Sequence, residues 1–253
     1  MALRSCGSVL ITGSNRGIGL ALVRELVTGT PSPKVVIGTC RKPQEGKELQ
    51  DLAKKYSNFR VVQLDVNDED SIQKAVKEVE GLTGNEGLNC LINNAGTNTM
   101  ASLNDVNVEV MMSAYRTNSV GVLMVTKAFL PLLKKAANLV SGMGVHRAAI
   151  INVSSDSGSI QLAEEKLIYL KVYPYRISKT ALNMISKCLA LDLKSEGILC
   201  IAFHPGWIQT DMGGPLAPLT LEETIPDVVT AISNLEERHS GTFIDWKGNT
   251  VPW

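Results

Sequence analysis

The chain has 253 residues, 44% of them hydrophobic, and its 25 basic and 25 acidic side chains give a formal net charge of zero. This length and composition are compatible with one α/β domain built around one extended core. A neutral chain offers no overall electrostatic attraction to nucleic acid or to an anionic membrane, so we expect a small molecule as its partner.

Short apolar runs alternate with longer segments of helical period along the chain. The runs expected to form strands are 8–11, 34–39, 60–64, 88–92, 148–153, 198–203 and 242–246. The segments expected to form helices are one that starts near residue 18 and ends before 29, and then 44–56, 70–79, 105–137, 175–193 and 226–235. The 105–137 helix should be the longest, with Pro131 as a candidate kink. This alternation predicts a single-domain, doubly wound Rossmann-type α/β fold with a mostly parallel sheet of about seven strands.

A glycine-rich turn of the spacing Gly-x-x-x-Gly-x-Gly lies between the first predicted strand and the first predicted helix. Backbone amides at such a turn bind anions, and the absence of a Cβ lets a phosphate approach. Taken alone the pattern also fits an ordinary turn, but its strand–turn–helix setting favours a dinucleotide site. The residues expected to contact the cofactor here are Gly13, Ser14, Asn15, Arg16, Gly17, Ile18 and Gly19.

The end of the second predicted strand indicates which dinucleotide binds. A carboxylate about twenty residues beyond the glycines usually binds a ribose 2′-hydroxyl. Here the sequence reads Thr39-Cys40-Arg41-Lys42, without a carboxylate. Arg41 and Arg16 can instead flank a 2′-phosphate with charge-assisted hydrogen bonds. NADP(H) is therefore the favoured cofactor, and the alternative is that both arginines are solvated surface charges.

Tyr175 and Lys179 are four residues apart on a predicted helix and therefore share one face. Of the five tyrosines, only Tyr175 has a lysine at this spacing. An amphipathic helix with a solvated lysine would give the same pattern by chance. A phenol titrates near 10, and a neighbouring ammonium is expected to stabilise the phenolate and lower the pKa of Tyr175.

Four features in this order resemble the signature of the short-chain dehydrogenase/reductase family: the glycine-rich turn, Asn118, Ser155 and the Tyr175–Lys179 pair. The resemblance extends from Leu10 to Trp253. Its closer details, such as Tyr175-Arg176-x-Ser178-Lys179 and His204-Pro205-Gly206-Trp207, are similar to the sniffer and C-factor branch of carbonyl reductases. The resemblance implies an NADPH-dependent reductase of reactive aldehydes, ketones or quinones.

The resemblance also implies roles for the matching side chains. Tyr175 would protonate the carbonyl oxygen while NADPH delivers hydride to the carbon, and Ser155 would position that oxygen. Lys179 would bind the nicotinamide ribose as well, and Asn118 would hold a water that links Lys179 to solvent. The remaining cofactor contacts implied by family motifs are Asp65, Val66, Asn94, Ala95, Gly96, Pro205, Gly206, Trp207, Ile208 and Thr210. Asp65 could equally be the N-cap of the helix that follows it.

The stretch from Ser155 to Tyr175 is longer than is usual in this family. Its residues from Ile160 to Val172 are expected to form a loop or short helix on the substrate side, as are those from Asp211 to Ile225. The family commonly dimerises through the 105–137 helix and the helix that carries Tyr175, so a homodimer is expected. The alternative is that the apolar residues of these two helices pack within the core of a single subunit.

Alternative function classes remain. An NADP(H)-binding sensor or signalling protein could use the same fold with dispensable catalysis. A hydrolase is disfavoured, because the three histidines are dispersed and no Gly-x-Ser-x-Gly motif occurs.

Compartment and metal content can also be predicted. The five cysteines lack CxxC or Cys/His spacing, which disfavours disulfides and structural zinc. A strand-like run begins within the first ten residues, and no apolar run is long enough to span a membrane. We therefore expect a cytoplasmic protein.

Overall fold

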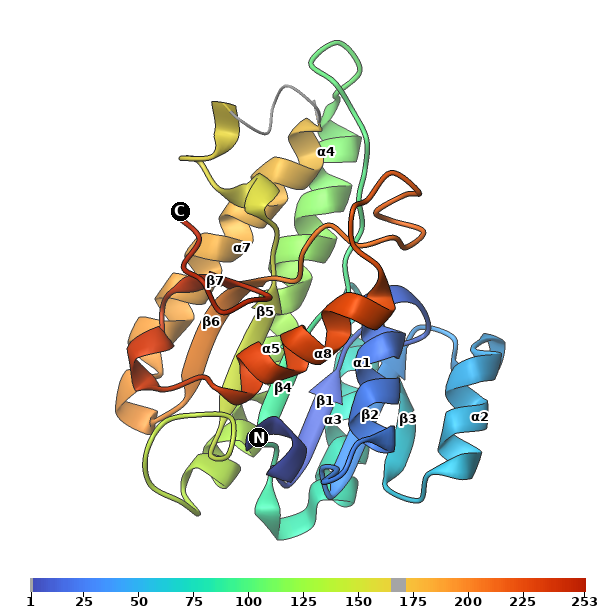
Figure 1. Cartoon of the computed structure of the whole chain (residues 1–253), viewed down its shortest axis with the longest axis vertical. Coiled ribbons are helices and arrows are strands. Elements are labelled where there is room, and N and C mark those ends of the chain that lie inside the picture. Colours follow the sequence, from blue (N-terminus) through green and yellow to red (C-terminus); the bar gives the residue numbers. More distant parts are fainter. Residues whose placement is uncertain (1, 165–171) are drawn as a thin grey trace.

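The sheet of this computed structural model, which describes residues 2–164 and 172–253, has seven parallel strands in the order β3-β2-β1-β4-β5-β6-β7 (Figure 1). The strands are β1 (Ser8–Ile11), β2 (Val35–Cys40), β3 (Phe59–Gln63), β4 (Cys90–Asn93), β5 (Ala149–Val153), β6 (Leu199–His204) and β7 (Phe243–Asp245). Each lies within a few residues of its predicted position. The strand order reverses direction between β1 and β4, which confirms the doubly wound fold.

Helices cover both faces of the sheet. They are α1 (Gly17–Thr28), α2 (Lys47–Lys55), α3 (Glu69–Thr83), α4 (Val108–Tyr115), α5 (Gly121–Ala137), α7 (Tyr173–Asp192) and α8 (Leu221–Ser233). Strand side chains alternate between the faces: Val9 and Ile11 pack in one core with α1, α2 and α8, whereas Leu10 packs in a second core with α3, α5 and α7. In Figure 1, α1 and α8 cross in front of the strands. Among the described residues, no helix has both the length and the apolar character needed to cross a bilayer.

The predicted 105–137 helix starts later than expected and is not uniformly α-helical. Asn107 caps its start, because the side-chain oxygen accepts a hydrogen bond from the backbone N–H of Val110 at 3.0 Å. The segment Arg116–Val120 forms a π-helical turn between α4 and α5. Such a turn shifts the register of the apolar stripe locally, and π-turns often carry functional residues. Here the turn contains Asn118.

The last long helix, predicted over 226–235, begins earlier, at Leu221. The hydroxyl of Thr220 accepts from the N–H of Glu223 at 3.3 Å, and the Glu223 carboxylate accepts from the N–H of Thr220 at 3.3 Å. This capping box satisfies two helix-end donors and fixes the start of α8. Residues 221–225 of the predicted substrate-side loop therefore belong to α8, and Pro226 lies inside the helix rather than at its start.

Two other helix ends differ from prediction. Helix α7 begins at Tyr173, so that Pro174 lies in its first turn, where the missing proline N–H costs no helical hydrogen bond. Helix α3 continues through Gly81 to Thr83. A Cβ added at Gly81 would meet no atom within 4 Å, so the position is open and the glycine does not end the helix.

The predicted segment from Ile160 to Val172 lies partly outside the described residues. At its start, the N–H of Gln161 donates to the carbonyl oxygen of Trp253 at 2.9 Å. The hydroxyl of Ser159 donates to the same oxygen at 3.2 Å. The C-terminal residue therefore lies against the start of this segment.

Candidate active site

The predicted site residues gather at the carboxyl edge of the parallel sheet. The glycine-rich turn follows β1, Arg41 follows β2, Asp65 follows β3 and Ser155 follows β5. The chain order reverses between β1 and β4 at this edge. Ligands of doubly wound folds usually bind at such a switch point.

The glycines of the first turn meet two different needs. Gly13 and Gly17 have φ angles of 67° and 55°, the left-handed region that glycine adopts most easily. A Cβ at Gly19 would lie 2.4 Å from the carbonyl oxygen of Gly13, so this glycine permits α1 to pack against the turn. Helix α1 has no side-chain cap at its N-terminus. Its first backbone N–H groups therefore suit a phosphate, which fits the predicted dinucleotide.

The turn after β4 is tied to the turn after β1. The hydroxyl of Thr12 accepts from the N–H groups of Asn94 at 3.0 Å and Ala95 at 2.9 Å. The Asn94 side-chain amide donates to the carbonyl oxygens of Thr12 at 2.9 Å and Gly13 at 3.1 Å. Next to it, the Asn93 amide reaches the Asn152 side-chain oxygen at 2.9 Å. These asparagines hold the two turns and neighbouring strands in register.

Ser14 and Asp65 make local contacts. The Ser14 hydroxyl donates to the carbonyl oxygen of Ile11 at 2.7 Å. The Asp65 carboxylate accepts from the N–H of Asn67 at 2.9 Å, whereas α3 is capped by Asp68. The alternative interpretation of Asp65 as the helix N-cap is therefore wrong, and its contact with adenine stays a prediction.

The turn after β3, which contains Val66, lies close to the start of α5. A Cβ at Gly121 would lie 2.8 Å from the carbonyl oxygen of Val66. The glycine inside the predicted long helix therefore permits this close approach. The predicted contact of Val66 with the cofactor is not tested by this packing.

The loop after β6 reaches the glycine-rich turn. Arg16 Nη1 lies 3.4 Å from the Asp211 carboxylate, with 70% and 80% of the two side chains exposed. A Cβ at Gly17 would lie 3.6 Å from Thr210 Cγ2. Arg41 is exposed at the end of β2. Thr210 and Arg16 are thus brought together at the first turn of α1.

The same loop turns sharply at Gly206 and carries an exposed indole. Gly206 has a φ of 95°, and a Cβ there would lie 2.7 Å from Leu219. The side chain of Trp207 is 45% exposed, while Ile208 is buried. The Trp207 indole N–H donates to the carbonyl oxygen of Gly213 at 2.8 Å, which closes the loop on itself.

Tyr175 and Lys179 lie together as predicted, with the lysine Nζ 5.7 Å from the centroid of the phenol ring. Lys179 is buried, and its ammonium donates to the carbonyl oxygen of Val153 at 2.7 Å. Burial lowers the pKa of Lys179 to about 8. It also raises the pKa of Tyr175 to about 12, while a hydrogen bond with Ser155 lowers that pKa and the charge of Asp156 raises it. The expectation that the pKa of Tyr175 is lowered is therefore wrong for this structure, in which desolvation has the largest effect.

Ser155 is held at the start of a short 3₁₀ turn (Asp156–Gly158). Its Oγ accepts from the N–H of Ser157 at 3.2 Å and lies 3.4 Å from Asp156 Oδ1. The N–H of Asp156 donates to Nδ1 of His204 at 3.3 Å. The sequence prediction did not assign a site role to Asp156 or His204. Each is adjacent to a predicted site residue, but their contact depends on the pairing of β5 with β6.

Asn118 uses both of its side-chain polar atoms to join neighbouring segments. Its amide nitrogen donates to the Thr97 carbonyl oxygen at 2.8 Å and to the Ser178 hydroxyl at 3.0 Å, and its oxygen accepts from the Thr97 N–H at 2.8 Å. A Cβ at Gly96 would lie 3.1 Å from the same oxygen. Asn118 therefore fixes α7 against the segment after β4, and its water-holding role stays a prediction.

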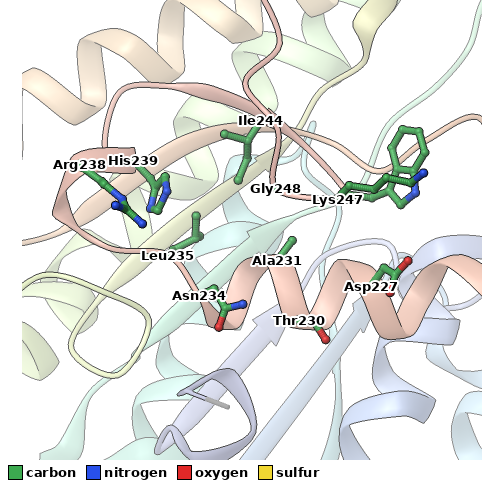
Figure 2. Close-up of a pocket in the computed structure, with 11 residues that line it drawn as sticks. Asp227, Thr230, Ala231, Asn234, Leu235, Arg238, His239, Ile244, Lys247 and Gly248 are labelled. Atoms are coloured by element: carbon green, nitrogen blue, oxygen red, sulfur yellow. The ribbon is translucent and has the colours of Figure 1, made fainter.

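A cavity of about 480 Å³ lies between α8 and the turn after β7, away from Tyr175 (Figure 2). Its lining includes Asp227 of α8, Asn234 directly after that helix, and Arg238. Trp246 also lines this cavity and packs edge-on against His204, with ring centroids 5.6 Å apart. Within residues 2–164 and 172–253, no group of His, Cys, Asp and Glu side chains is suited to hold a metal ion.

Comparison with known proteins gives consistent matches. The model of the short chain dehydrogenase family matches residues 8–218. The carbonyl reductase Sniffer of D. melanogaster is 43% identical, covering 98% of this chain and all of its own, with a TM-score of 0.93. An NADPH-bound carbonyl reductase from chicken fatty liver is 42% identical over 98% of this chain and 100% of its own, with a TM-score of 0.94. The C-signal protein of Myxococcus xanthus is 37% identical over 64% of this chain and 91% of its own length.

Proposed function

The chain belongs to the short-chain dehydrogenase family, and from this premise we propose that it is an NADPH-dependent carbonyl reductase. The proposed substrates are small reactive aldehydes, ketones or quinones. The observation that carries the proposal is the meeting of Tyr175 with Ser155 and buried Lys179 at the carboxyl edge of the sheet. The similarity to two carbonyl reductases over nearly the whole chain supports it.

The chemistry of each side chain suits reduction. The pKa of Tyr175 is raised to about 12, so the phenol carries its proton at neutral pH and can donate it to a carbonyl oxygen. The pKa of Lys179 is about 8, so its ammonium is charged at neutral pH and stabilises the phenolate that remains. The Ser155 hydroxyl orients the carbonyl oxygen. Bound NADPH would supply the hydride.

The residues around the carboxyl edge also suit a dinucleotide phosphate. The N-terminus of α1, without a side-chain cap, would hold the pyrophosphate. Arg16 and Arg41 would hold the 2′-phosphate. The ion pair of Arg16 with Asp211 is strongly exposed, so it is weak and phosphate can replace it. Gly96 and the loop after β6 would contact the nicotinamide half.

The test of this function is a panel of aldehydes, quinones and ketosteroids, with NADPH consumption followed by absorbance. Turnover of at least one class is expected. A second candidate function, an NADP(H)-binding signalling protein with dispensable catalysis, is favoured by the similarity to the C-signal protein. Tight NADPH binding without turnover anywhere in the panel would support that alternative and contradict the reductase.

Replacing Arg41 by aspartate should reverse or flatten the preference for NADPH over NADH. The new carboxylate repels the 2′-phosphate and offers a partner to the 2′-hydroxyl of NADH. Because Arg41 is exposed, solvent screening limits the loss, and we expect kcat/KM with NADPH to fall by about 10- to 100-fold. Both cofactors are compared at fixed ionic strength, with Arg238→Asp as a control of equal charge change. If the ratio of kcat/KM with NADPH to kcat/KM with NADH were unchanged, Arg41 would be only a solvated surface charge.

We also propose that the chain forms a homodimer through α4 and α7. These helices pack against each other and run side by side in Figure 1. They carry exposed apolar side chains, including Val108 (77%), Met112 (55%), Met184 (65%) and Leu191 (65%). Large apolar side chains that gather on an exposed surface often mark interfaces. Light scattering should give twice the monomer mass of 27.3 kDa, and Met184→Asp should shift the mass to the monomer. A monomer mass for the unmodified protein would exclude the dimer.

The proposed compartment is the cytoplasm. All five cysteines are free thiols, and four of them are buried. Burial raises the pKa of Cys6 to about 12, which keeps that thiol protonated and unreactive. Free, unpaired thiols suit a reducing compartment.

A further inference from the structure

A tight turn in the loop after β6 presents the carboxylate of Asp211 to the glycine-rich turn. The N–H of Gly213 donates to the Thr210 hydroxyl at 3.0 Å, and the N–H of Gly214 donates to the Thr210 carbonyl oxygen at 2.8 Å. A Cβ at Gly213 would overlap the carbonyl oxygen of Ile208, so the glycine lets the chain fold back closely. The backbone of this turn therefore fixes where Asp211 lies.

The partner of this carboxylate is Arg16, although 195 positions separate the two residues in the sequence. Arg16 Nη1 donates to Asp211 Oδ2 at 3.4 Å. Within the part of the chain that the structure describes, the Asp211 carboxylate has no other hydrogen bond or ion pair. It takes no part in the bonds that close its own turn. Loss of the charge of Asp211 should therefore leave the turn folded.

The ion pair brings an anion to the start of α1. Arg16 directly precedes this helix, and Thr210 Cγ2 would lie 3.6 Å from a Cβ at Gly17, the first helical residue. The proposed function places the phosphates of the cofactor at the same helix end. A carboxylate and a 2′-phosphate both suit a guanidinium group. Because like charges repel, each anion weakens the binding of the other to Arg16.

We propose that Asp211 is a specificity-determining residue that competes with the 2′-phosphate of NADP(H) for Arg16. This inference rests on the proposed function, because it takes Arg16 as a ligand of that phosphate. The competition lowers affinity for the cofactor that carries a 2′-phosphate, so it narrows the preference for NADPH over NADH and eases the release of NADP⁺. The coupling is reciprocal: a bound 2′-phosphate breaks the ion pair and frees the loop after β6 from the glycine-rich turn.

The test is a binding titration of NADPH and of NADH with the wild type, Asp211→Asn, Arg16→Gln and the double variant. Low ionic strength is used, because salt screens exposed charges. Asp211→Asn should raise the ratio of the Kd for NADH to the Kd for NADPH by about two- to fivefold, as expected for an exposed ion pair. Arg16→Gln should lower this ratio, and Asp211→Asn should then have no further effect on it. Asp192→Asn, which removes the same charge at the exposed end of α7, should leave the ratio unchanged.

Three results would overturn the competition alone. They are an unchanged ratio in Asp211→Asn, a lower ratio, which would mean that Asp211 orients Arg16 toward the phosphate, and an equal gain in the Arg16→Gln background, which would mean a general effect of charge. Wild-type NADPH affinity in Arg16→Gln would overturn the proposed phosphate ligand, and this inference with it. Because the titrations need no carbonyl substrate, an absence of turnover would overturn the reductase function and leave the competition for Arg16 standing.

Discussion

Replacing Tyr175 by phenylalanine should lower kcat for carbonyl reduction by about 100- to 10,000-fold, the range of general acid catalysis. The variant removes only the hydroxyl, and the aromatic ring keeps its place beside Lys179. NADPH affinity should therefore change little. The measurements are kcat and KM with one active aldehyde or quinone, and a fluorescence titration with NADPH.

A matched control for this variant lies two positions away. Tyr173→Phe makes the same chemical change in the first turn of α7, at a side chain that is 37% exposed. It should retain wild-type turnover. Comparable turnover in Tyr175→Phe and Tyr173→Phe would remove Tyr175 from the mechanism.

Replacing Lys179 by methionine should reduce both rate and cofactor affinity, because one amine is expected to serve both. Loss of the ammonium leaves the phenolate of Tyr175 without its nearest cation, and kcat should fall by at least about 100-fold. Loss of the charged bond to the ribose should weaken NADPH binding by about 10- to 100-fold. Intact NADPH affinity would show that the ribose contact is wrong.

The same variant should reveal the energetic cost of the buried amine. Burial lowers the pKa of Lys179 from 10.5 to about 8. Between these pH values the unfolded chain binds a proton that the folded chain has released. The free energy of unfolding therefore rises with pH over this range. The free energy of unfolding of the wild type, relative to Lys179→Met, should therefore increase from pH 8 to 10.5, by up to roughly 3 kcal/mol. Urea unfolding across this range measures the difference, and a constant difference would contradict the depressed pKa.

The positions of the strands were predictable because each is a short apolar run between turn-forming segments. The site could be located for the same reason: carboxyl ends of parallel strands meet at one edge, so Arg41, Asp65 and Ser155 had to lie near one another. Hydrophobic periodicity did not reveal the π-turn around Asn118, since one extra residue only shifts the apolar stripe. The early start of α8 depends on hydrogen bonds between Thr220 and Glu223, which an apolar pattern does not indicate.

Long-range electrostatics were the least predictable part. The spacing of Tyr175 and Lys179 indicated correctly that the two side chains meet. It did not indicate that burial would raise the pKa of the phenol and lower that of the amine, because desolvation depends on segments distant in sequence. The contact between Asp156 and His204 could not be predicted for a similar reason, because these residues meet only where β5 pairs with β6.

Transfer of deuterium from cofactor to product tests the central claim most directly. The protein is incubated with an active carbonyl substrate and NADPH that carries deuterium at the transferable position of the nicotinamide, and the alcohol is analysed by mass spectrometry. Our account predicts that the label appears on the former carbonyl carbon in the wild type, and that Tyr175→Phe forms this product far more slowly. An alcohol without the label, or no alcohol from any carbonyl compound while NADPH still binds, would contradict it.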